Sequence, residues 1–458
     1  MPRTIFHVDV NSAFLSWSAL EALKKDPGSV DLRTIPSAVG GDVKTRHGVI
    51  TARSIPAKKF GVKTGEPVVK ALQKCPNLVL VPSDFTAYRR NSHAFMDLLA
   101  GFSPVLEQLS IDEAFLDMTD ALDRFPGKDD REKALAAAEE IRARVRGELL
   151  FTVNVGISSN RLLAKTASDF TKPDKTHTLY PEEIPAKFWV LPIEDLYGCG
   201  GATAGRLRDF GIRTVGDAAR TDRELLQNLL GDKSGAYIHA ASNGRSSDVI
   251  EPVRERAKSY SNETTTSVDI TADNYVSDAF PILESLSARV AGRMKKDRVV
   301  AQTIGVMVKT TGFSRRSKQV SLPDPTNDEA LIQETVRRLF EELCTGEEGL
   351  FARGFALRLL GASAGTITDE GGFRQLSLFD GFSEAPAEEA PSPAPAPEKE
   401  KPEAEEKPDP APSEKESKGP SGTAHNRKQA LDSMLASLNG KFGKGSIGTL
   451  SSLENRLP

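Results

Sequence analysis

The sequence has few of the features that mark membrane or secreted proteins. Its 458 residues include no uncharged apolar run approaching the roughly 18–20 residues that a membrane-spanning helix needs. The chain reaches an aspartate, Asp9, before the apolar core of a secretory signal could form. We therefore expect a cytoplasmic protein with no membrane partner.

Cysteine is equally scarce. The 3 cysteines, Cys75, Cys199 and Cys344, lie too far apart for a disulfide framework or a paired-cysteine metal site, which fits a reducing compartment. At roughly 100–200 residues per domain, a chain of this length predicts two to four domains.

An excess of positive charge is also lacking, which at first sight argues against a nucleic-acid partner. The formal net charge of −4 is, however, an average over two unlike parts. Residues 380–418 hold twelve acidic residues against five lysines, so the rest of the chain carries +3. The acidic stretch is rich in proline and glutamate and has too little apolar surface to offset chain entropy. We expect a disordered linker over residues 383–424, followed by a short basic segment over residues 425–458.

Basic residues of the remaining chain concentrate between residues 289 and 320. This stretch holds nine lysines and arginines and one acidic residue. Such a concentration is a candidate surface for the phosphate backbone of a nucleic acid. The alternative is a solvated helix face followed by a sheet edge that charge protects from pairing.

Hydrophobic periodicity predicts a mixture of helices and strands. The first part of the chain predicts strands at residues 4–8 and 151–157, a hairpin at residues 108–117, and helices at residues 12–24, 87–101 and 131–146. Residues 191–244 have a mostly helical pattern with glycine-rich breaks. A second unit follows, with strands at residues 260–268, 302–309 and 355–360 and helices at residues 279–296 and 328–343. The fold class expected from this order is α+β with several domains.

Acidic residues lie at the ends of the predicted strands. Asp9 ends the first apolar run, and Asp112 and Glu113 are neighbours in the predicted hairpin. Three oxygen donors of this kind suit hard cations such as Mg²⁺, and a pair of such ions serves phosphoryl or nucleotidyl transfer. Because neighbours on a regular strand point to opposite faces, Asp112 and Glu113 can reach one site only at a turn or distortion. The alternative is that these acids are solvated side chains at a hairpin tip.

Three sequence segments are more specific evidence of function than the acidic residues alone. They read HVDVNSAF at residues 7–14, SIDEAFLD at residues 110–117 and VGISSNRLLAK at residues 155–165. In order and spacing they resemble the Y-family translesion DNA polymerases, and within that family the bacterial DNA polymerase IV branch. The resemblance covers about residues 3–380.

The resemblance implies a template-directed, low-fidelity DNA polymerase that adds deoxynucleotides to a primer 3′-OH in translesion synthesis and DNA repair. It implies that Asp9, Asp112 and Glu113 are the catalytic residues and that, with the carbonyl of Val10, they bind two Mg²⁺ ions. It also implies a right-hand fold, with a palm at residues 1–21 and 85–180, fingers at 22–84, a helix-hairpin-helix thumb at 181–246 and a little finger at 256–362.

Two nucleotide-binding residues follow from the same resemblance. Phe14 lies five residues after Asp9, where the family has the bulky residue that blocks a ribose 2′-OH. As a lone residue, Phe14 would be a core aromatic at the start of a helix, and both interpretations can hold. Lys172 matches the lysine that contacts the incoming triphosphate, and a point charge suits phosphate.

The finger segment departs from the family pattern. Residues 51–61 read TARSIPAKKFG, one residue longer than that pattern and without its tyrosine. Lys58 takes the place of an arginine, so it can meet a phosphate but cannot make a bidentate fork. Ala13 stands where an aromatic is common. These departures concern the roof of the site, on which lesion preference depends.

Residues 196–212 resemble the helix-hairpin-helix of the family's thumb. Gly198 and Gly200 are expected to let the backbone approach a DNA phosphate, although such a glycine turn alone is more often a plain helix connector. In the little finger, contacts to the duplex backbone are expected to be independent of sequence and sensitive to salt. The residues expected to make them are Arg293, Lys295, Arg315 and Arg316.

Residues 375–379, QLSLF, resemble the pentapeptide by which bacterial polymerases bind the sliding clamp, the beta subunit. A glutamine anchor and an apolar pair can fill a shallow pocket as an extended peptide. The alternative is a short strand that caps the core. A further apolar stripe between residues 431 and 438 indicates either a second docking element or a weakly folded tail. The expected clamp contacts are Gln375, Leu376, Leu378 and Phe379.

Two other functions stay open on sequence grounds. A silent relative acting as an adaptor at the clamp is expected to lack the acidic triad, yet all three acids are present. A two-metal nuclease fits the carboxylates but not the thumb, little-finger and nucleotide-lysine matches. The expected partners of a polymerase are primer-template DNA, a dNTP and the clamp. We expect a monomer in the bacterial cytoplasm, associated with the nucleoid when it is on DNA.

Overall fold

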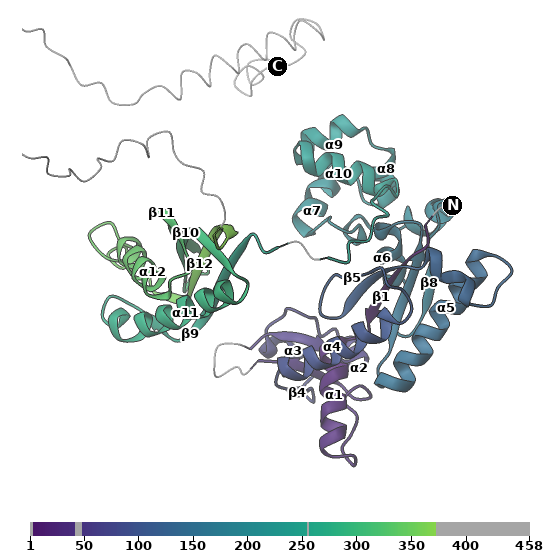
Figure 1. Cartoon of the computed structure of the whole chain (residues 1–458), viewed down its shortest axis with the longest axis horizontal. Helices are drawn as coiled ribbons and strands as arrows, with labels where there is room; N and C mark the ends of the chain where they lie inside the picture. The colour runs from purple at the N-terminus through teal and green to yellow at the C-terminus, as the bar shows by residue number, and fades with distance from the viewer. Residues whose placement is uncertain (1–2, 42–47, 254–255, 372–458) are drawn as a thin grey trace, which may run out of the picture. The chain divides into compact units, whose positions relative to one another are not determined.

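The computed structural model describes residues 3–41, 48–253 and 256–371 of the chain (Figure 1). The predicted clamp motif, acidic linker and C-terminal segment all lie outside these residues. Within the described part, helices and strands follow one another as expected for an α+β fold. No helix of this part combines the length and apolar character that crossing a membrane requires.

A five-stranded sheet forms the first core, and β1 (Ile5–Val10) is its central strand. β1 pairs antiparallel with β6 (Glu113–Asp117) on one side and with β7 (Val153–Ser158) on the other. The short strands β5 (Leu106–Gln108) and β8 (Thr176–Thr178) complete the two edges. All but one of the residues of β1 are buried, which explains why this strand reads as a near-continuous apolar run.

Helices pack on both faces of this sheet. The even-numbered residues of β1 point into a core shared with α4 (Phe85–Ala100) and α5 (Asp130–Arg144). On the opposite face, Ile5 packs against α6 (Arg161–Asp169). The predicted helix at residues 131–146 is longer than α5, because its last turn widens into a π-helical turn, η3 (Val145–Leu149).

A smaller sheet lies in the chain between α1 (Ala13–Lys25) and α4. Its strands run in the order β3-β2-β4, with β2 (Ser37–Gly40), β3 (Ile50–Arg53) and β4 (Val79–Val81). The helices α2 (Ile55–Lys59) and α3 (Val68–Lys74) contribute Ala57, Val68 and Ala71 to its buried cluster.

The segment predicted to be helical contains four short α-helices. They are α7 (Gly201–Asp209), α8 (Val215–Arg220), α9 (Arg223–Leu230) and α10 (Asp232–Ser242). Two of the predicted glycine breaks separate them, because Gly211 and Gly231 have φ values of 82° and 87°, a backbone region that favours glycine.

A second α+β part follows, as the sequence predicted. Its antiparallel sheet has the order β11-β10-β12-β9. The strands are β9 (Ser259–Ile270), β10 (Val299–Thr310), β11 (Arg315–Thr326) and β12 (Leu357–Asp369). The helices α11 (Phe280–Lys296) and α12 (Glu329–Cys344) share its apolar core. β11 is an edge strand with exposed basic residues, so part of the basic stretch does protect a sheet edge.

Close packing of α6 on β7 depends on Gly156. A side-chain carbon at this position would overlap the carbonyl oxygen of Ala164 and the amide nitrogen of Ser168. We expect Gly156→Ala to lower the free energy of unfolding by about 1–3 kcal/mol, because rigid backbone atoms meet the new methyl group. The measurement is the midpoint of denaturant unfolding, followed by circular dichroism. Gly147→Ala, with open space around the added carbon, is the matched control, and equal midpoints for the two variants would contradict the prediction.

Candidate functional site

The end of β1 and the turn before β6 bring the three predicted acids to one region. Asp9 lies opposite Glu113 in the β1–β6 register. The turn is tied to β1, because the amide of Val10 donates a hydrogen bond of 3.0 Å to the carbonyl oxygen of Asp112. Asp112 lies in this turn and Glu113 is the first residue of β6, so the turn required by two adjacent carboxylates is present.

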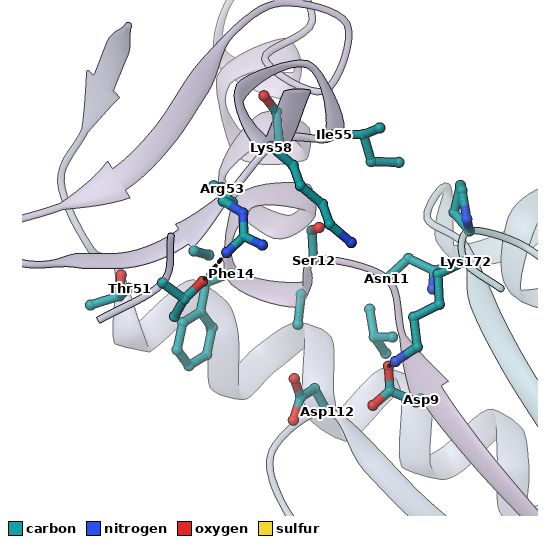
Figure 2. Close-up of a pocket in the computed structure, with 16 residues that line it drawn as sticks. Asp9, Asn11, Ser12, Phe14, Thr51, Arg53, Ile55, Lys58, Asp112 and Lys172 are labelled. Carbon is teal, nitrogen blue, oxygen red and sulfur yellow. Dashed lines mark hydrogen bonds and ion pairs between the residues drawn. The ribbon is translucent and has the colours of Figure 1, made fainter. Parts of the chain in front are cut away.

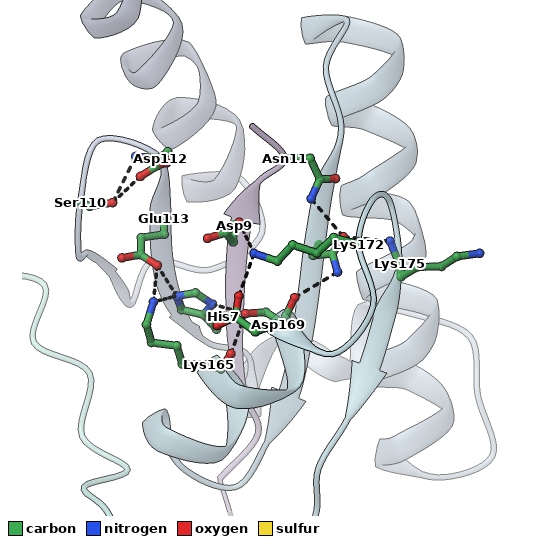
Figure 3. Close-up of polar contacts among 12 residues, drawn as sticks. His7, Asp9, Asn11, Ser110, Asp112, Glu113, Lys165, Asp169, Lys172 and Lys175 are labelled. Atoms are coloured by element: carbon green, nitrogen blue, oxygen red, sulfur yellow. Dashed lines mark hydrogen bonds and ion pairs between the residues drawn. The ribbon is translucent and has the colours of Figure 1, made fainter. Parts of the chain in front are cut away.

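The three carboxylates nevertheless have different partners (Figure 3). Lys172 Nζ lies 2.8 Å from Oδ1 of Asp9, and the Ser110 hydroxyl donates to Oδ1 of Asp112 at 2.6 Å. Glu113 pairs with Lys165 instead. In the described ranges, no group of three His, Cys, Asp or Glu side chains lies close enough together to hold a metal ion. The structure thus brings the acids to one region without closing them into a cluster.

Asp9 is the acid with the strongest need for positive charge. Burial raises the pKa of its carboxyl to about 6, although Lys172 opposes this shift, and the nearby Asp112 adds to it. Burial by itself lowers the pKa of Lys172, but Asp9 and Asp169 outweigh burial and leave that pKa raised. A largely buried carboxylate with hard oxygen donors and a second acid nearby fits a divalent cation.

Glu113 belongs to a buried polar group that the sequence motifs contain but do not explain. His7 Nε2 lies 3.1 Å from Oε2 of Glu113, and Nδ1 of His7 lies 2.8 Å from the Ser168 hydroxyl. Burial lowers the pKa of His7 to about 4, so the ring is neutral near pH 7. Burial alone raises the pKa of Glu113, but contacts with His7 and Lys165 outweigh it and hold that pKa at about 2. Glu113 is therefore an ionised carboxylate whose orientation is fixed by its neighbours.

Lys172 is positioned by the loop that carries it. The amide of Asp174 donates to Oδ1 of Asn11 at 2.9 Å, and Nδ2 of Asn154 donates to the carbonyl of Thr171 at 2.7 Å. Both asparagines are buried, so they anchor the loop to β7 and to the residue that follows β1. Sequence reasoning missed this role, because a buried asparagine has no distinctive spacing.

A cavity of about 380 Å³ connects the acids with the small sheet (Figure 2). Its lining includes six residues that the sequence predicted, which are Asp9, Val10, Phe14, Lys58, Asp112 and Lys172. Glu113 is not among the lining residues. Thr51 and Arg53 of β3 also line the cavity, and sequence reasoning did not single them out. The cavity therefore has acids on one side and cations from the small sheet on the other.

Phe14 has the core role that its sequence position allowed and also lines the cavity, and the block to a 2′-OH stays a prediction. Its ring stacks on Tyr88, with centroids 4.6 Å apart and planes 12° apart. Tyr88 is fully buried, and its hydroxyl lies 2.8 Å from that of Ser18. Phe14 is thus a core aromatic that also lines the cavity, on a support that limits its movement.

The structure gives a different account of each of the two predicted thumb glycines. Gly198 has a φ of 83°, and a side-chain carbon there would lie 2.6 Å from the ring of Tyr237. Gly200 is the N-cap of α7, and a carbon added there would meet nothing within 4 Å. Packing alone accounts for Gly198, whereas Gly200 presents open backbone at a helix start.

The four basic residues predicted to contact DNA do not share one surface. Arg293 and Lys295 are both exposed on α11, and Arg293 donates to the carbonyl of Ser261 at 3.0 Å and lies over the ring of Tyr260. Arg315 and Arg316 are neighbours on β11, so their side chains point to opposite faces of the sheet. The predicted clamp contacts Gln375, Leu376, Leu378 and Phe379 lie outside the described residues.

Comparisons with known proteins agree with this arrangement. The sequence model of the impB/mucB/samB family matches residues 8–169, and the model of its C-terminal domain matches residues 257–378. DNA polymerase IV of Clostridium acetobutylicum is 38% identical over 380 residues, which are 83% of this chain and 91% of that protein. DNA polymerase IV of Bacillus velezensis is 32% identical over 84% of this chain and 87% of that protein.

A solved structure has the same fold. The Y-family DNA polymerase chimera Dbh-Dpo4(243-245)-Dbh superposes with a TM-score of 0.66 at 22% identity, and the match covers 80% of this chain and 99% of that one. The solved structure shows the fold, and the sequence matches show the family. The chain belongs to the impB/mucB/samB family, and it is a Y-family DNA-directed DNA polymerase of the DNA polymerase IV type.

Proposed function

We propose that the cavity between the end of β1 and the small sheet is where the chain adds a deoxynucleotide to a primer 3′-OH. The observation that carries this proposal is the cavity's lining, in which Asp9, Asp112 and the Lys172 paired with Asp9 share a space of about 380 Å³ with Lys58 from α2. A nucleoside triphosphate needs this combination of charges, because its phosphates require cations and the metal ions that accompany it require acids.

Residues 1–21 and 85–180 act as the palm, and residues 22–84 act as the fingers. Residues 181–246 act as the thumb, and residues 256–362 act as the little finger. In support of this division, Asp9 and Glu113 belong to the five-stranded sheet and Asp112 to the turn before β6, whereas Lys58 belongs to a helix beside the small sheet. Low fidelity and lesion bypass fit a cavity that is open to solvent on one side.

Polymerases of this family depend on divalent metal ions, and we assign two Mg²⁺ ions to this site. Asp9, Asp112, Glu113 and the carbonyl of Val10 would hold them. The chemistry of the donors fits, because all are hard oxygens and the pKa of the largely buried Asp9 stays raised although Lys172 lies beside it. When bound, the ions supply charge stabilisation for phosphoryl transfer.

The chain's own side chains orient the nucleotide. Lys172 and Lys58 bind its phosphates as point charges. Phe14 lies under the sugar, where its ring leaves no room for a 2′-OH. Lys165 and His7 keep Glu113 ionised and fixed in direction. These groups act by position and charge, which is how most phosphoryl-transfer sites work.

The thumb and little finger hold the duplex. Gly198 and Gly200 lie at the helix-hairpin-helix turn, where backbone N–H groups donate to a phosphate. Exposed basic side chains of the little finger contact the backbone without reading sequence. The residues assigned to this contact are Arg293, Lys295, Arg315 and Arg316. Because they lie on different faces of this part, they fit contacts around a duplex better than contacts along one flat side of it.

The sliding clamp recruits the chain through residues 375–379. Tethering to a ring on DNA raises the effective concentration of a polymerase that dissociates often, so modest affinity suffices. The chain acts as a monomer in the bacterial cytoplasm and joins the nucleoid when it is on DNA.

We expect Asp112→Asn to lower primer extension by on the order of 10²–10³-fold, because one of the charges that the reaction needs is removed. The measurement is single-turnover extension of a primer-template with Mg²⁺ and dNTPs. Asp97→Asn, an exposed acid on α4, is the matched control and should extend normally. Undiminished extension by Asp112→Asn would overturn the assignment. Absence of extension by the wild type would favour a clamp adaptor, and primer shortening without dNTPs would favour a nuclease.

Phe14→Ala is expected to admit ribonucleotides, because removing the ring opens space for the 2′-OH. The readout is the ratio of kcat/KM for dNTPs over rNTPs, which should fall by about tenfold or more for a steric block of this size. Phe85→Ala removes another ring of the same aromatic cluster that does not line the cavity, so its ratio should stay near the wild-type value. An unchanged ratio for Phe14→Ala would contradict the role of Phe14.

Replacing Gln375, Leu378 and Phe379 together by alanine is expected to abolish clamp binding while leaving clamp-independent extension unchanged. The energy of such a peptide resides in a few anchoring side chains, so their loss removes most of it. Binding is measured by surface plasmon resonance with immobilised clamp. Ser377→Ala, within the same pentapeptide, serves as the control, and retained binding by the triple variant would refute the motif.

A further inference from the structure

Arg53 lines the cavity but has no part in the roles proposed above. It is the last residue of β3, and the two-residue repeat of a strand puts its side chain on the same side as that of Thr51, which also lines the cavity. Figure 2 shows its guanidinium on the Phe14 side of the cavity, away from Asp9 and Lys172.

The guanidinium of Arg53 uses only part of its hydrogen-bonding capacity. Its Nη1 donates to the hydroxyl of Thr64 at 3.2 Å, and Thr64 is also a lining residue. Its Nε is shielded from solvent and has no hydrogen-bond partner among the described residues. A shielded donor on a charged group costs free energy when it is left unpaired. A ligand in the cavity cannot reach this closed Nε, but it can offer acceptors to the two Nη groups, whose one hydrogen bond to the described residues is that to Thr64.

We propose that Arg53 reads the base of the incoming nucleotide and favours a purine, guanine above adenine. This inference rests on the proposed function, which puts the triphosphate at Lys172 and the sugar over Phe14. A nucleotide held in that way extends its base away from Lys172, toward the side of the cavity where Arg53 lies. A triphosphate contact for Arg53 fits less well, because Lys172 lies at the other side.

The chemistry of the base edges sets the preference. Guanine presents N7 and O6 as a pair of acceptors, and an arginine meets such a pair with two parallel N–H groups. Adenine presents N7 next to a donor, and pyrimidines have no N7. Lys58 cannot make this distinction, because its ammonium is a single point charge on a flexible stem. Arg53 therefore gives the finger segment a planar guanidinium, which Lys58 lacks, and this guanidinium faces the base.

The test compares dGTP with 7-deaza-dGTP, which pairs normally but carries carbon in place of N7. Single-turnover insertion opposite template cytosine gives kcat/KM for each substrate. We expect the full-length wild type to use 7-deaza-dGTP about tenfold less efficiently, as for the loss of a good bidentate contact. Arg53→Ala should use the two substrates equally well. Lys58→Ala is the matched control, because it should lower both values by one factor and keep their ratio.

A second variant keeps the inference testable if Arg53→Ala fails to fold. Thr64→Val keeps the arginine and removes the hydroxyl that holds it, so the tenfold ratio should shrink while insertion of dCTP opposite guanine changes little. Equal use of the two substrates by the wild type would overturn the inference. So would an Arg53→Ala variant that loses efficiency with all four dNTPs by one factor, which indicates a phosphate or structural role.

Two further outcomes distinguish a failure of the role of Arg53 from a failure of the proposed function. Discrimination that depends on 7-deazaguanine in the template, and not on the incoming nucleotide, would mean that Arg53 reads the template and would overturn the assignment. No insertion at all by the wild type would refute the proposed function itself, whereas insertion without any N7 dependence would refute only the role of Arg53.

Discussion

The site depends on one carboxylate held at the end of a buried strand. Asp9 belongs to β1, which has helices on both faces, so its ionised form needs a positive charge close by. Lys172 supplies that charge at 2.8 Å. The loop that carries Lys172 is bound in turn to Asn11, two residues after Asp9, through the amide of Asp174. Removing either link would leave a buried charge without its partner, so the strand end and the loop have to form together.

The cations that balance the acids come from a single stretch of chain. Lys165 lies on α6 and Lys172 on the loop that follows it, and they pair with Glu113 and Asp9 respectively. Both lysines reach the acids only because α6 packs directly on β7, which requires a glycine at position 156. The glycine of the segment VGISSNRLLAK is thus a packing requirement with an electrostatic consequence. A shift of α6 away from the sheet would separate two ion pairs at once.

Pattern and spacing predicted the elements of this site better than its side-chain directions. Strand ends locate Asp9 and Asp112, because apolar runs and the acids that end them are visible in the sequence. The separate partners of the three acids depend on Ser110, Lys165 and Lys172, which are brought close only by the fold. Likewise, no local pattern could show that Tyr237 leaves room only for a glycine at position 198, since the two residues are 39 positions apart in the sequence. Two adjacent arginines on β11 look like one patch in sequence, yet the pleat of a strand separates them.

The finger segment shows how a fold can keep its geometry while its sequence departs from the family pattern. Ser54 is buried, its hydroxyl accepts from the amides of Ala57 and Ser37, and it donates to the carbonyl of Ile35. This one side chain both starts α2 and ties it to β2, so the turn between β3 and α2 has a fixed direction. A proline in the first turn of α2 adds to this, because its φ already suits a helix. The direction of Lys58, on α2, and that of Arg53, on β3, are therefore set by backbone contacts that do not involve the family's missing tyrosine. Changes in the residues that line the roof can alter which nucleotide it prefers without altering where the roof lies.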